Sequence, residues 1–380
     1  WDSFKLVELG KFIGGGTPSS SNLSFWTGSI PWISSSDIKE DNINNISISR
    51  YITEEAIEKS ATKYCPAPVI LIVSRVGVGK VALSHTSLCT SQDFCNIIEI
   101  KCHPVFLSYN LLRTMKRKSR EVQGTSIKGI TSDELQKMRV FIPKNKDEQN
   151  KISNLLTLLD ERIATQNKII EDLKKLKSAI IEKTFNENYS NKIRLRDVGS
   201  YIRGLTYSSD DVVESNGIFV MRSNNIINGS SLDYHNNIVS VNKQILTEQQ
   251  LQTGDIVICM ANGSSSLVGK SSFYDGDCST PITVGAFCGI YRSKEPIVKW
   301  LFQTNKYRRY IWNSLQGGNG AIANLNGDDI LRMSFSIPAT PAKDNRIKLL
   351  TSVDTLLESN ISLCDLYISQ KLYLLRQMFI

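Results

Sequence analysis

The sequence contains few histidines, no closely spaced cysteine pair and no long apolar run. Its three histidines (His85, His103 and His235) lie far apart, and none of its eight cysteines forms a C-x-x-C pair. We therefore expect no metal site, and we interpret the cysteines as buried free thiols of a reducing compartment. No apolar run approaches the roughly 18 residues that a membrane span requires. A membrane protein is excluded on this ground.

The composition is that of a soluble and moderately basic protein. Hydrophobic residues make up 41% and charged residues 22% of the chain. The opening residues 1–10 (WDSFKLVELG) lack the basic start and apolar stretch of a signal peptide, so we expect a cytoplasmic protein. The net charge of +8 favours a polyanionic partner, although many ordinary proteins are this basic. Charge alone therefore supports nucleic-acid binding only weakly.

An internal repeat is the most informative feature present. Residues 127–143 (IKGITSDELQKMRVFIP) align without a gap with residues 322–338 (IANLNGDDILRMSFSIP). Further segments match in the same order at a displacement of about 190 residues. These pairs are 5–13 with 194–202, 30–38 with 218–226, 69–73 with 255–259, and 94–97 with 287–290. The chain therefore contains two similar domains.

Each domain combines short strands with helical patches. The β-rich runs 69–73, 96–100 and 256–259 lie between turns rich in Gly, Ser and Asn, and helical patches occur at 53–62 and 298–312. These patterns predict an α+β fold. We place the two domains at residues 1–145 and 188–340, and a helical region after each, at 146–187 and 341–380.

The two helical regions have apolar residues at spacings of mostly three and four. This period over more than four turns predicts long amphipathic helices with a coiled-coil seam. The seam residues are Ile152, Leu156, Leu159, Ile163, Ile170, Leu173, Leu176 and Ile180 in the first helix, and Ile347, Leu350, Val353, Leu357, Ile361, Cys364, Ile368, Leu372 and Leu375 in the second.

A helix of about 38 residues is roughly 55 Å long, too long to lie against one small domain. We predict an antiparallel pair with the two domains at opposite ends and an internal pseudo-two-fold axis. Such a spacer suits the reading of DNA at two points roughly 34 Å apart. The alternative is that the helices simply dimerise the protein, but dimerisation needs only one such helix per chain.

A set of short segments connects the chain to a known family. They are the opening residues 1–18, Ser36-Asp37-Ile38 and Asn224-Asn225-Ile226, the Arg75-x-Gly77-x-Gly79 turn, residues 141–143 (FIP), Glu148-Gln149-x-x-Ile152, and Asp160-x-x-Ile163 with the tail at 176–185 (LKSAIIEKTF). In this order the chain resembles the specificity subunit of Type I restriction-modification systems over nearly its whole length. The second half departs in having Lys343-Asp344 where the first has Glu148-Gln149.

The resemblance implies a subunit that reads DNA without catalysing a reaction. Each domain would be a target recognition domain for one half of a bipartite, asymmetric target in double-stranded DNA. The helices would set the spacing and dock two methyltransferase subunits, and restriction subunits would join through the complex. S-adenosylmethionine would bind to the methyltransferase partner, so no cofactor is expected on this chain. The alternatives are a two-headed DNA-binding or scaffold protein unrelated to restriction, and a stand-alone enzyme.

Segments that approach catalytic motifs depart from them at decisive positions. The run 263–271 (GSSSLVGKS) has five residues between its glycines, where a phosphate-binding loop has four. Asp93 with 99–101 (EIK) resembles a nuclease site, but the paired segment 292–294 reads RSK. A DNA methyltransferase would need an Asn-Pro-Pro type turn and a glycine-rich cofactor loop, and the sequence has neither. We therefore predict no catalytic site.

Loops that contain cations and polar side chains are the candidate DNA contacts, because cations neutralise phosphates while Arg, Asn, Gln and Ser read base edges. Each could equally be a solvated surface residue, as could the basic run 116–120 (KRKSR). The paired loops differ, which predicts that the two domains read different sequences. The candidates are Ser34, Ser36, Arg75, Lys80, Gln92 and Lys128 in domain 1, and Arg222, Asn224, Asn262, Ser264, Lys270 and Asn319 in domain 2.

Overall fold

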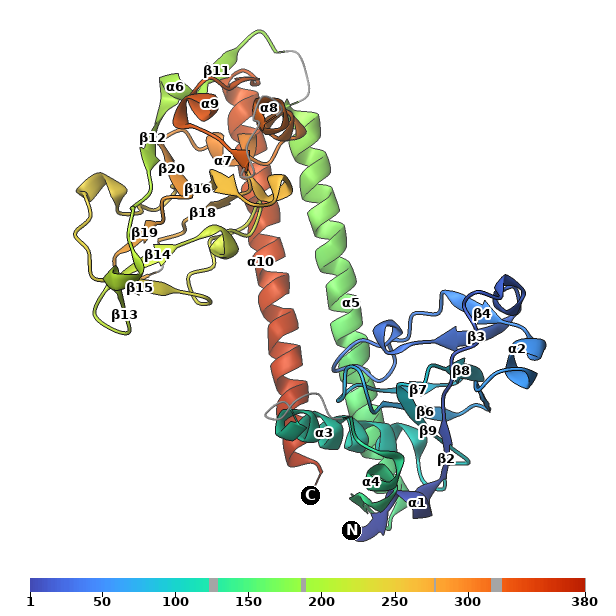
Figure 1. Ribbon diagram of the computed structural model, residues 1–380. Coiled ribbons are helices and arrows are strands. Elements are labelled where there is room, and N and C mark those ends of the chain that lie inside the picture. Colours follow the sequence, from blue (N-terminus) through green and yellow to red (C-terminus); the bar gives the residue numbers. More distant parts are fainter. Residues whose placement is uncertain (123–128, 186–188, 277, 316–322, 380) are drawn as a thin grey trace. The chain divides into compact units, whose positions relative to one another are not determined.

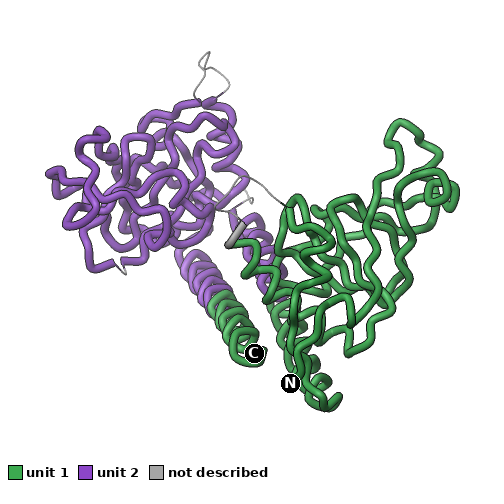
Figure 2. Tube along the Cα trace, turned by 60° about the horizontal axis from the view of Figure 1, so that its bottom comes forward, with its two compact units in different colours: residues 1–168, 361–380 green, residues 169–360 purple. Residues whose placement is uncertain are grey.

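The chain divides into two units (Figure 2). Each unit has its own hydrophobic cores. The computed structural model describes residues 1–122, 129–185, 189–276, 278–315 and 323–379. Unit 1 comprises residues 1–168 and 361–380, and unit 2 comprises residues 169–360. Each unit therefore contains one part of each of two long helices, α5 (Lys146–Phe185) and α10 (Thr340–Gln377).

Unit 1 is built from two four-stranded sheets and a two-stranded ribbon (Figure 1). The antiparallel sheet has the order β2-β9-β6-β7, and the mixed sheet β4-β3-β8-β5 pairs β3 and β8 in parallel. The ribbon pairs β1 with β10. The strands are β1 Asp2–Lys5, β2 Lys11–Gly14, β3 Ile30–Ile33, β4 Arg50–Ile52, β5 Tyr64–Cys65, β6 Val69–Val73, β7 Val81–Ser84, β8 Leu88–Thr90, β9 Phe94–Ile98 and β10 Arg139–Ile142. The helices besides α5 and α10 are α1 Leu6–Leu9, α2 Glu54–Glu58, α3 Pro104–Val122 and α4 Ser132–Lys137, with short 3-10 turns η1 Leu23–Trp26 and η2 Ser35–Asp37.

Unit 2 repeats this plan. Its antiparallel sheet has the order β12-β20-β16-β18, its mixed sheet β13-β15-β14-β19 pairs β14 and β19 in parallel, and its ribbons pair β11 with β22 and β17 with β21. The strands are β11 Lys192–Arg194, β12 Gly199–Arg203, β13 Val212–Val213, β14 Ile218–Met221, β15 Val239–Val241, β16 Ile256–Cys259, β17 Ala261–Asn262, β18 Ser271–Phe273, β19 Ile282–Val284, β20 Cys288–Ser293, β21 Ala323–Asn324 and β22 Ser334–Ser336. The helices are α6 Leu195–Val198, α7 Val298–Leu301, α8 Asn305–Leu315 and α9 Gly327–Leu331, with 3-10 turns η3 Ser209–Asp211, η4 Ser223–Asn225, η5 Thr247–Gln249 and η6 Ser265–Leu267.

The sequence repeat corresponds to a structural repeat, and the predicted α+β class is confirmed. The paired segments form equivalent strands: β3 and β14, β6 and β16, and β9 and β20. The longest match forms a capped helix and a ribbon strand in both units. Thr131 caps α4 and Asn326 caps α9, each by accepting a backbone N–H at the helix start, which a short polar side chain does well. The predicted helical patch at 298–312 is two helices, α7 and α8, rather than one.

The helices α5 and α10 pack together within each unit and run antiparallel. In unit 1 Asp160 of α5 contacts Lys371 of α10, and Asn167 of α5 contacts Cys364 of α10. The second contact lies seven residues later in α5 and seven residues earlier in α10, as in an antiparallel pair. Both helices also enter the globular cores. Ile152, Leu156, Leu375 and Phe379 belong to the core of unit 1, and Ile181, Phe185 and Leu350 to that of unit 2. Full burial of such a side chain stabilises the fold by about 1.5–3 kcal/mol.

The predicted seam is wrong at two positions. Leu176 is 49% exposed and Ile368 is 39% exposed, whereas the adjacent Lys177 and the nearby Lys371 are 7% and 4% exposed. The apolar period therefore misses two buried charges, because helical spacing does not show which neighbour of a given residue faces the partner helix. Among the described residues, no helix is both long and apolar enough to cross a bilayer.

The Glu148-Gln149 motif is structural. Glu148 accepts a hydrogen bond from the indole N–H of Trp1 at 2.8 Å. The Gln149 side chain donates to the carbonyl of Pro143 at 2.9 Å and accepts from the backbone N–H of His103 at 3.0 Å. The motif therefore ties the start of α5 to the globular part of unit 1. The second half lacks the motif, and α10 still forms from Thr340.

Candidate nucleic-acid interface

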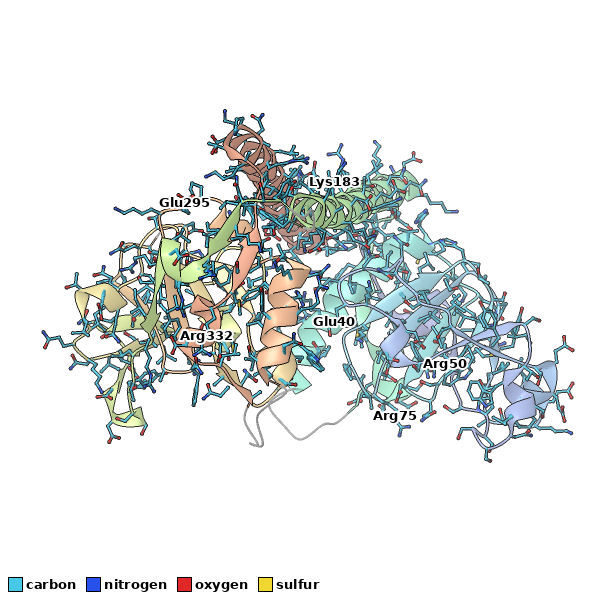
Figure 3. The ribbon with its side chains drawn as sticks, turned by 90° about the horizontal axis from the view of Figure 1, so that it is seen from above. Glu40, Arg50, Arg75, Lys183, Glu295 and Arg332 are labelled. Carbon is cyan, nitrogen blue, oxygen red and sulfur yellow. The ribbon has the colours of Figure 1, made fainter. Side chains whose placement is uncertain are left out.

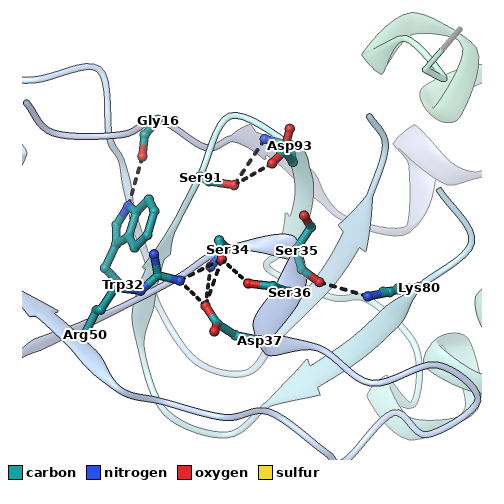
Figure 4. A network of polar contacts seen from close by, with 10 residues as sticks. All are labelled: Gly16, Trp32, Ser34, Ser35, Ser36, Asp37, Arg50, Lys80, Ser91 and Asp93. Carbon is teal, nitrogen blue, oxygen red and sulfur yellow. Dashed lines mark hydrogen bonds and ion pairs between the residues drawn. The ribbon is translucent and has the colours of Figure 1, made fainter. Parts of the chain in front are cut away.

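A polar network surrounds η2, directly after β3 in unit 1 (Figure 4). Asp37 accepts hydrogen bonds from the backbone N–H of Ser34 at 2.7 Å and from its hydroxyl at 3.0 Å. Arg50 forms an ion pair with Asp37 and donates to the Ser34 hydroxyl at 2.6 Å, while its guanidinium lies 4.6 Å from the Trp32 ring centroid. The network holds the backbone of this loop in one conformation.

Three of the predicted DNA contacts meet at this network. The hydroxyls of Ser34 and Ser36 lie 2.9 Å apart, and the Lys80 ammonium donates to the carbonyl of Ser35 at 3.1 Å. Ser36 is exposed, while Ser34 and Lys80 are half-buried. The hydroxyl of Ser34 is engaged within the protein by Asp37 and Arg50. Ser36 and Lys80 are thus the more available groups, and Ser34 supports them.

Arg75 and Gln92 lie at a second place in unit 1. Both are exposed (Arg75 is labelled in Figure 3), and both line a pocket with Ser74, Thr131 and Ser132. The Gln92 side chain accepts a hydrogen bond from the Thr17 hydroxyl. The sequence analysis did not select Thr131 or Ser132, which cap and begin α4.

In unit 2 four predicted contacts gather at η4, the equivalent of η2. The amide of Asn262 donates to the Ser223 hydroxyl at 3.3 Å and accepts from the backbone N–H of Ser264 at 3.0 Å. Arg222 and Asn224 flank Ser223 and are exposed, and the Arg222 guanidinium donates to the carbonyl of Asn237 at 3.4 Å. Two loops that are far apart in sequence therefore present amide, hydroxyl and guanidinium groups together.

Lys270 lines a different pocket, between η6 and α8. Its neighbours there include Ser265, Ser266, Arg308 and Trp312. Arg308 is exposed, and Trp312 is 61% exposed although it is the largest side-chain type. Within the described ranges, no ion pair engages Lys270 or Arg308. The sequence reading passed over α8, although an exposed aromatic among cations is a signal of nucleic-acid contact.

The basic run 116–120 lies on α3 in unit 1. The Lys116 ammonium forms an ion pair with Asp41 at 2.7 Å. Arg113, Arg117 and Arg120 line a pocket with the same Asp41. A carboxylate inside this group partly offsets its positive charge. The two remaining candidates, Lys128 and Asn319, lie outside the described residues.

No group of three or more His, Cys, Asp or Glu that could hold a metal ion occurs in the part of the chain that the structure describes. The cysteines are free, and Cys102 and Cys278 are half-buried while the other six are buried. Burial raises the pKa of the Cys65 thiol to about 11 and that of the Cys288 thiol to about 12. These two thiols therefore stay protonated at neutral pH and are poor nucleophiles.

The duplicated fold places a polar loop at the same position in each of the two units, after β3 in unit 1 and after β14 in unit 2. Residues 1–175 match the family model described as Type I restriction modification DNA specificity domain. Over 194 residues the chain is 33% identical to the Type I restriction enzyme MjaIX specificity subunit of Methanocaldococcus jannaschii. This alignment covers 49% of this chain and 44% of that protein. Over 163 residues it is 35% identical to the EcoR124I/EcoR124II specificity subunit of Escherichia coli, covering 41% of this chain and 40% of that protein. The matches thus span less than half of the length of these curated relatives.

Solved structures agree with this fold. The crystal structure of a Type I restriction-modification S subunit from M. genitalium has a TM-score of 0.61 at 15% identity, covering 100% of this chain and 96% of that one. A chain from a study of the assembly and conformational transition of the type I R-M system has a TM-score of 0.55 at 13% identity, covering 100% and 97%. Residues 1–175 therefore match the Type I specificity domain that the sequence resemblance predicted, and the whole chain has the fold of these solved structures.

Proposed function

We propose that this chain is the non-catalytic DNA-recognition subunit of a Type I restriction-modification complex. One observation carries the proposal: the loops that follow the equivalent strands β3 and β14 have the same backbone placement but different side chains. Ser34 and Ser36 stand in unit 1 where Arg222 and Asn224 stand in unit 2. Base edges are read by such groups, so equal scaffolds with unequal loops suit two different half-targets.

The exposed apolar side chains of α5 and α10 support docking of methyltransferase subunits. Large apolar side chains that stay exposed along a helix are candidates for an interaction site. These side chains are Leu155, Leu158, Ile169 and Leu176 on α5, and Leu349, Leu356, Leu363, Leu366, Ile368 and Tyr373 on α10. In the proposed complex the methyltransferase subunits bind S-adenosylmethionine, restriction subunits join them, and the two helices set the spacing between the half-targets.

Methylation mapping tests the reading of DNA. Genomes of cells with and without the gene are compared for methylated positions. We expect a split, asymmetric motif that is methylated only when the gene is present. Unchanged methylation in the presence of a competent methyltransferase partner would contradict the proposal.

Experiments with purified components test whether the chain lacks catalytic activity of its own and binds methyltransferase subunits. The chain alone, given S-adenosylmethionine and DNA, should neither methylate nor cleave. Mixed with its methyltransferase subunit, it should bind two copies, because the docking surface is repeated. Turnover without a partner would indicate a stand-alone enzyme, and DNA binding without any methyltransferase binding would favour a two-headed protein unrelated to restriction.

A further inference from the structure

A buried lysine joins three parts of unit 1 at one point. The Lys371 ammonium of α10 forms an ion pair with Asp160 of α5, and the two side chains are only 5% and 4% exposed. The same ammonium donates a hydrogen bond of 2.6 Å to the carbonyl of Asp41, in the loop that follows η2. It also lies 5.6 Å from the ring centroid of Tyr109, on α3. We name these four groups the unit 1 clamp.

Unit 2 contains the same arrangement with the two long helices exchanged. The Lys177 ammonium of α5 lies 2.6 Å from Asp354 of α10, and both side chains are 8% exposed. It donates a hydrogen bond of 2.8 Å to the carbonyl of Gly229, in the loop that follows η4, and lies 5.5 Å from the ring centroid of Trp300. These four groups form the unit 2 clamp. The same combination of a buried lysine, an aspartate of the other long helix, a loop carbonyl and an aromatic ring thus occurs once in each unit.

The second oxygen of Asp160 accepts a hydrogen bond, and that of Asp354 lies at ion-pair distance from a second lysine. In unit 1 the Tyr109 hydroxyl donates to Asp160 at 2.7 Å. In unit 2 the Lys299 ammonium lies 2.8 Å from Asp354. Burying an ion pair costs desolvation free energy, and apolar residues of similar volume are often at least as stabilising. Helix association alone therefore does not explain why charges occupy these two seam positions.

An ammonium offers what an apolar side chain cannot, namely three directed donors. In each clamp the ammonium contacts an aspartate of the other long helix and a loop carbonyl, so α5, α10 and one loop of the globular part meet at a single point. The clamped loop residue lies five positions after a candidate DNA contact: Asp41 follows Ser36, and Gly229 follows Asn224. The clamp thus restrains the base of the loop that presents those side chains.

We propose that Lys371 and Lys177 are positioning residues, each of which fixes the orientation of one DNA-reading loop on the helix pair. Each acts on its own unit, so the reading of the two half-targets is set by two independent clamps. The consequence for DNA rests on the proposed function, whereas the restraint on the loops does not.

Hydrogen exchange of the full-length chain tests the restraint without DNA. In Lys371→Met, amide exchange over residues 38–46 should rise about tenfold above any rise in the rest of unit 1, while residues 225–231 stay unchanged. The reason is that the variant loses the hydrogen bond to the Asp41 carbonyl in addition to the ion pair with Asp160. Lys177→Met should give the reverse pattern, so each variant is the control for the other. Unchanged exchange in the clamped loop, or a loss spread over the whole unit, would overturn the inference.

A charge exchange separates positioning from simple helix pairing. Asp160→Lys combined with Lys371→Asp restores an ion pair between α5 and α10 but removes the donor to the Asp41 carbonyl. We expect the helix pairing to recover and the fast exchange at residues 38–46 to remain. Recovery of both would show that the lysine acts only through the helices.

DNA reading is then compared in the complex with methyltransferase subunits, on duplexes carrying the mapped target. A base change in either half should weaken binding of the wild-type complex about tenfold. Lys371→Met should reduce that penalty in one half-target only, and Lys177→Met in the other. A uniform loss of affinity without loss of discrimination would refute the positioning role. If the wild-type complex does not discriminate the target from altered duplexes, the proposed function is contradicted. The hydrogen-exchange experiment still tests the role of the clamp by itself.

Discussion

Units 1 and 2 share one fold but balance charge differently where the globular part meets the long helices. In unit 1 one lysine, Lys371, and one neutral hydroxyl, that of Tyr109, satisfy Asp160. In unit 2 two lysines, Lys177 and Lys299, share Asp354. The comparison teaches that the repeat preserves the geometry of the junction, while the second group beside the aspartate has changed from the neutral hydroxyl of Tyr109 to the charged ammonium of Lys299.

The helices α3 and α8 also differ in how their positive side chains are paired. On α3 of unit 1, the Lys116 ammonium is paired with Asp41. On α8 of unit 2, Arg308 is exposed beside Trp312 and Lys270. No acidic side chain among the described residues lines that pocket, whereas Glu182 lines the neighbouring one with Arg308. Lys116 thus has a carboxylate within ion-pair distance, whereas Lys270 and Arg308 have none among the described residues. The two units are equivalent as scaffolds but not as electrostatic surfaces.

Removing the clamp carboxylates, Asp354 and Asp160, should have the largest effect on the free energy of unfolding. Asp354→Ala leaves two lysines without a counterion and should destabilise unit 2 by about 3–5 kcal/mol, as loss of one partner of a buried pair does. Asp160→Ala leaves one lysine and a hydroxyl, so its effect on unit 1 should be smaller. Urea unfolding followed by hydrogen exchange in β16 and in β6 measures each unit separately. An equal or larger loss in unit 1 would contradict the comparison.

The second-largest effect on stability is expected for substitutions at two equivalent glycines, Gly269 and Gly79. Both have positive φ, +78° at Gly269 and +112° at Gly79, and both pack on a helix. A Cβ at Gly269 would lie 2.6 Å from Ile311 in the core, whereas one at Gly79 would lie 3.1 Å from the Ser119 hydroxyl. Gly269→Ala should therefore cost the more, about 1–3 kcal/mol, measured as the change in Tm. Gly263→Ala, where a Cβ meets open space, is the control and should be nearly neutral.

The salt dependence of DNA binding tests the electrostatic comparison. Arg308→Ala should lower the slope of log affinity against log salt by about one, as loss of one phosphate contact does. Lys116→Ala should change it less, because Asp41 already neutralises that ammonium. Lys59→Ala, an exposed lysine paired with Glu55, is the control. A larger change for Lys116 than for Arg308 would reverse the assignment of the two helices.

The smallest expected effect is a pH dependence at the unit 2 clamp. Burial is the main cause that lowers the pKa of Lys177, and Lys299 adds to it, while Asp354 and Glu358 oppose it. Between the lowered pKa and the ordinary value of 10.5, the unfolded chain binds more protons, so this lysine's contribution to stability rises with pH there. It is lost as the pH falls through the lowered pKa. The Tm of the wild type relative to Lys177→Met should therefore rise from pH 8 towards 10.5; a fall would show that the sign is wrong.

Much of the fold and part of the candidate site could be predicted from the sequence. The gapless match of residues 127–143 with 322–338 indicates the duplication, and caps, strands and helix periods are local signals that survive in each copy. The gathering of Arg222, Asn224, Asn262 and Ser264 was not readable, because Asn262 meets Ser223 only through tertiary packing. Arg308 and Trp312 were missed for the same reason.

The sequence by itself determined the α+β class, the two copies and the long helix after each. These depend on periodicity and on residues near one another along the chain. Only the tertiary structure decided which residues face one another: that Lys177 and Lys371, rather than Leu176 and Ile368, are buried, and that each reaches an aspartate on the other helix and a loop carbonyl. A helical period repeats every 3.6 residues, so it identifies a face of the helix but not the partner that lies against it.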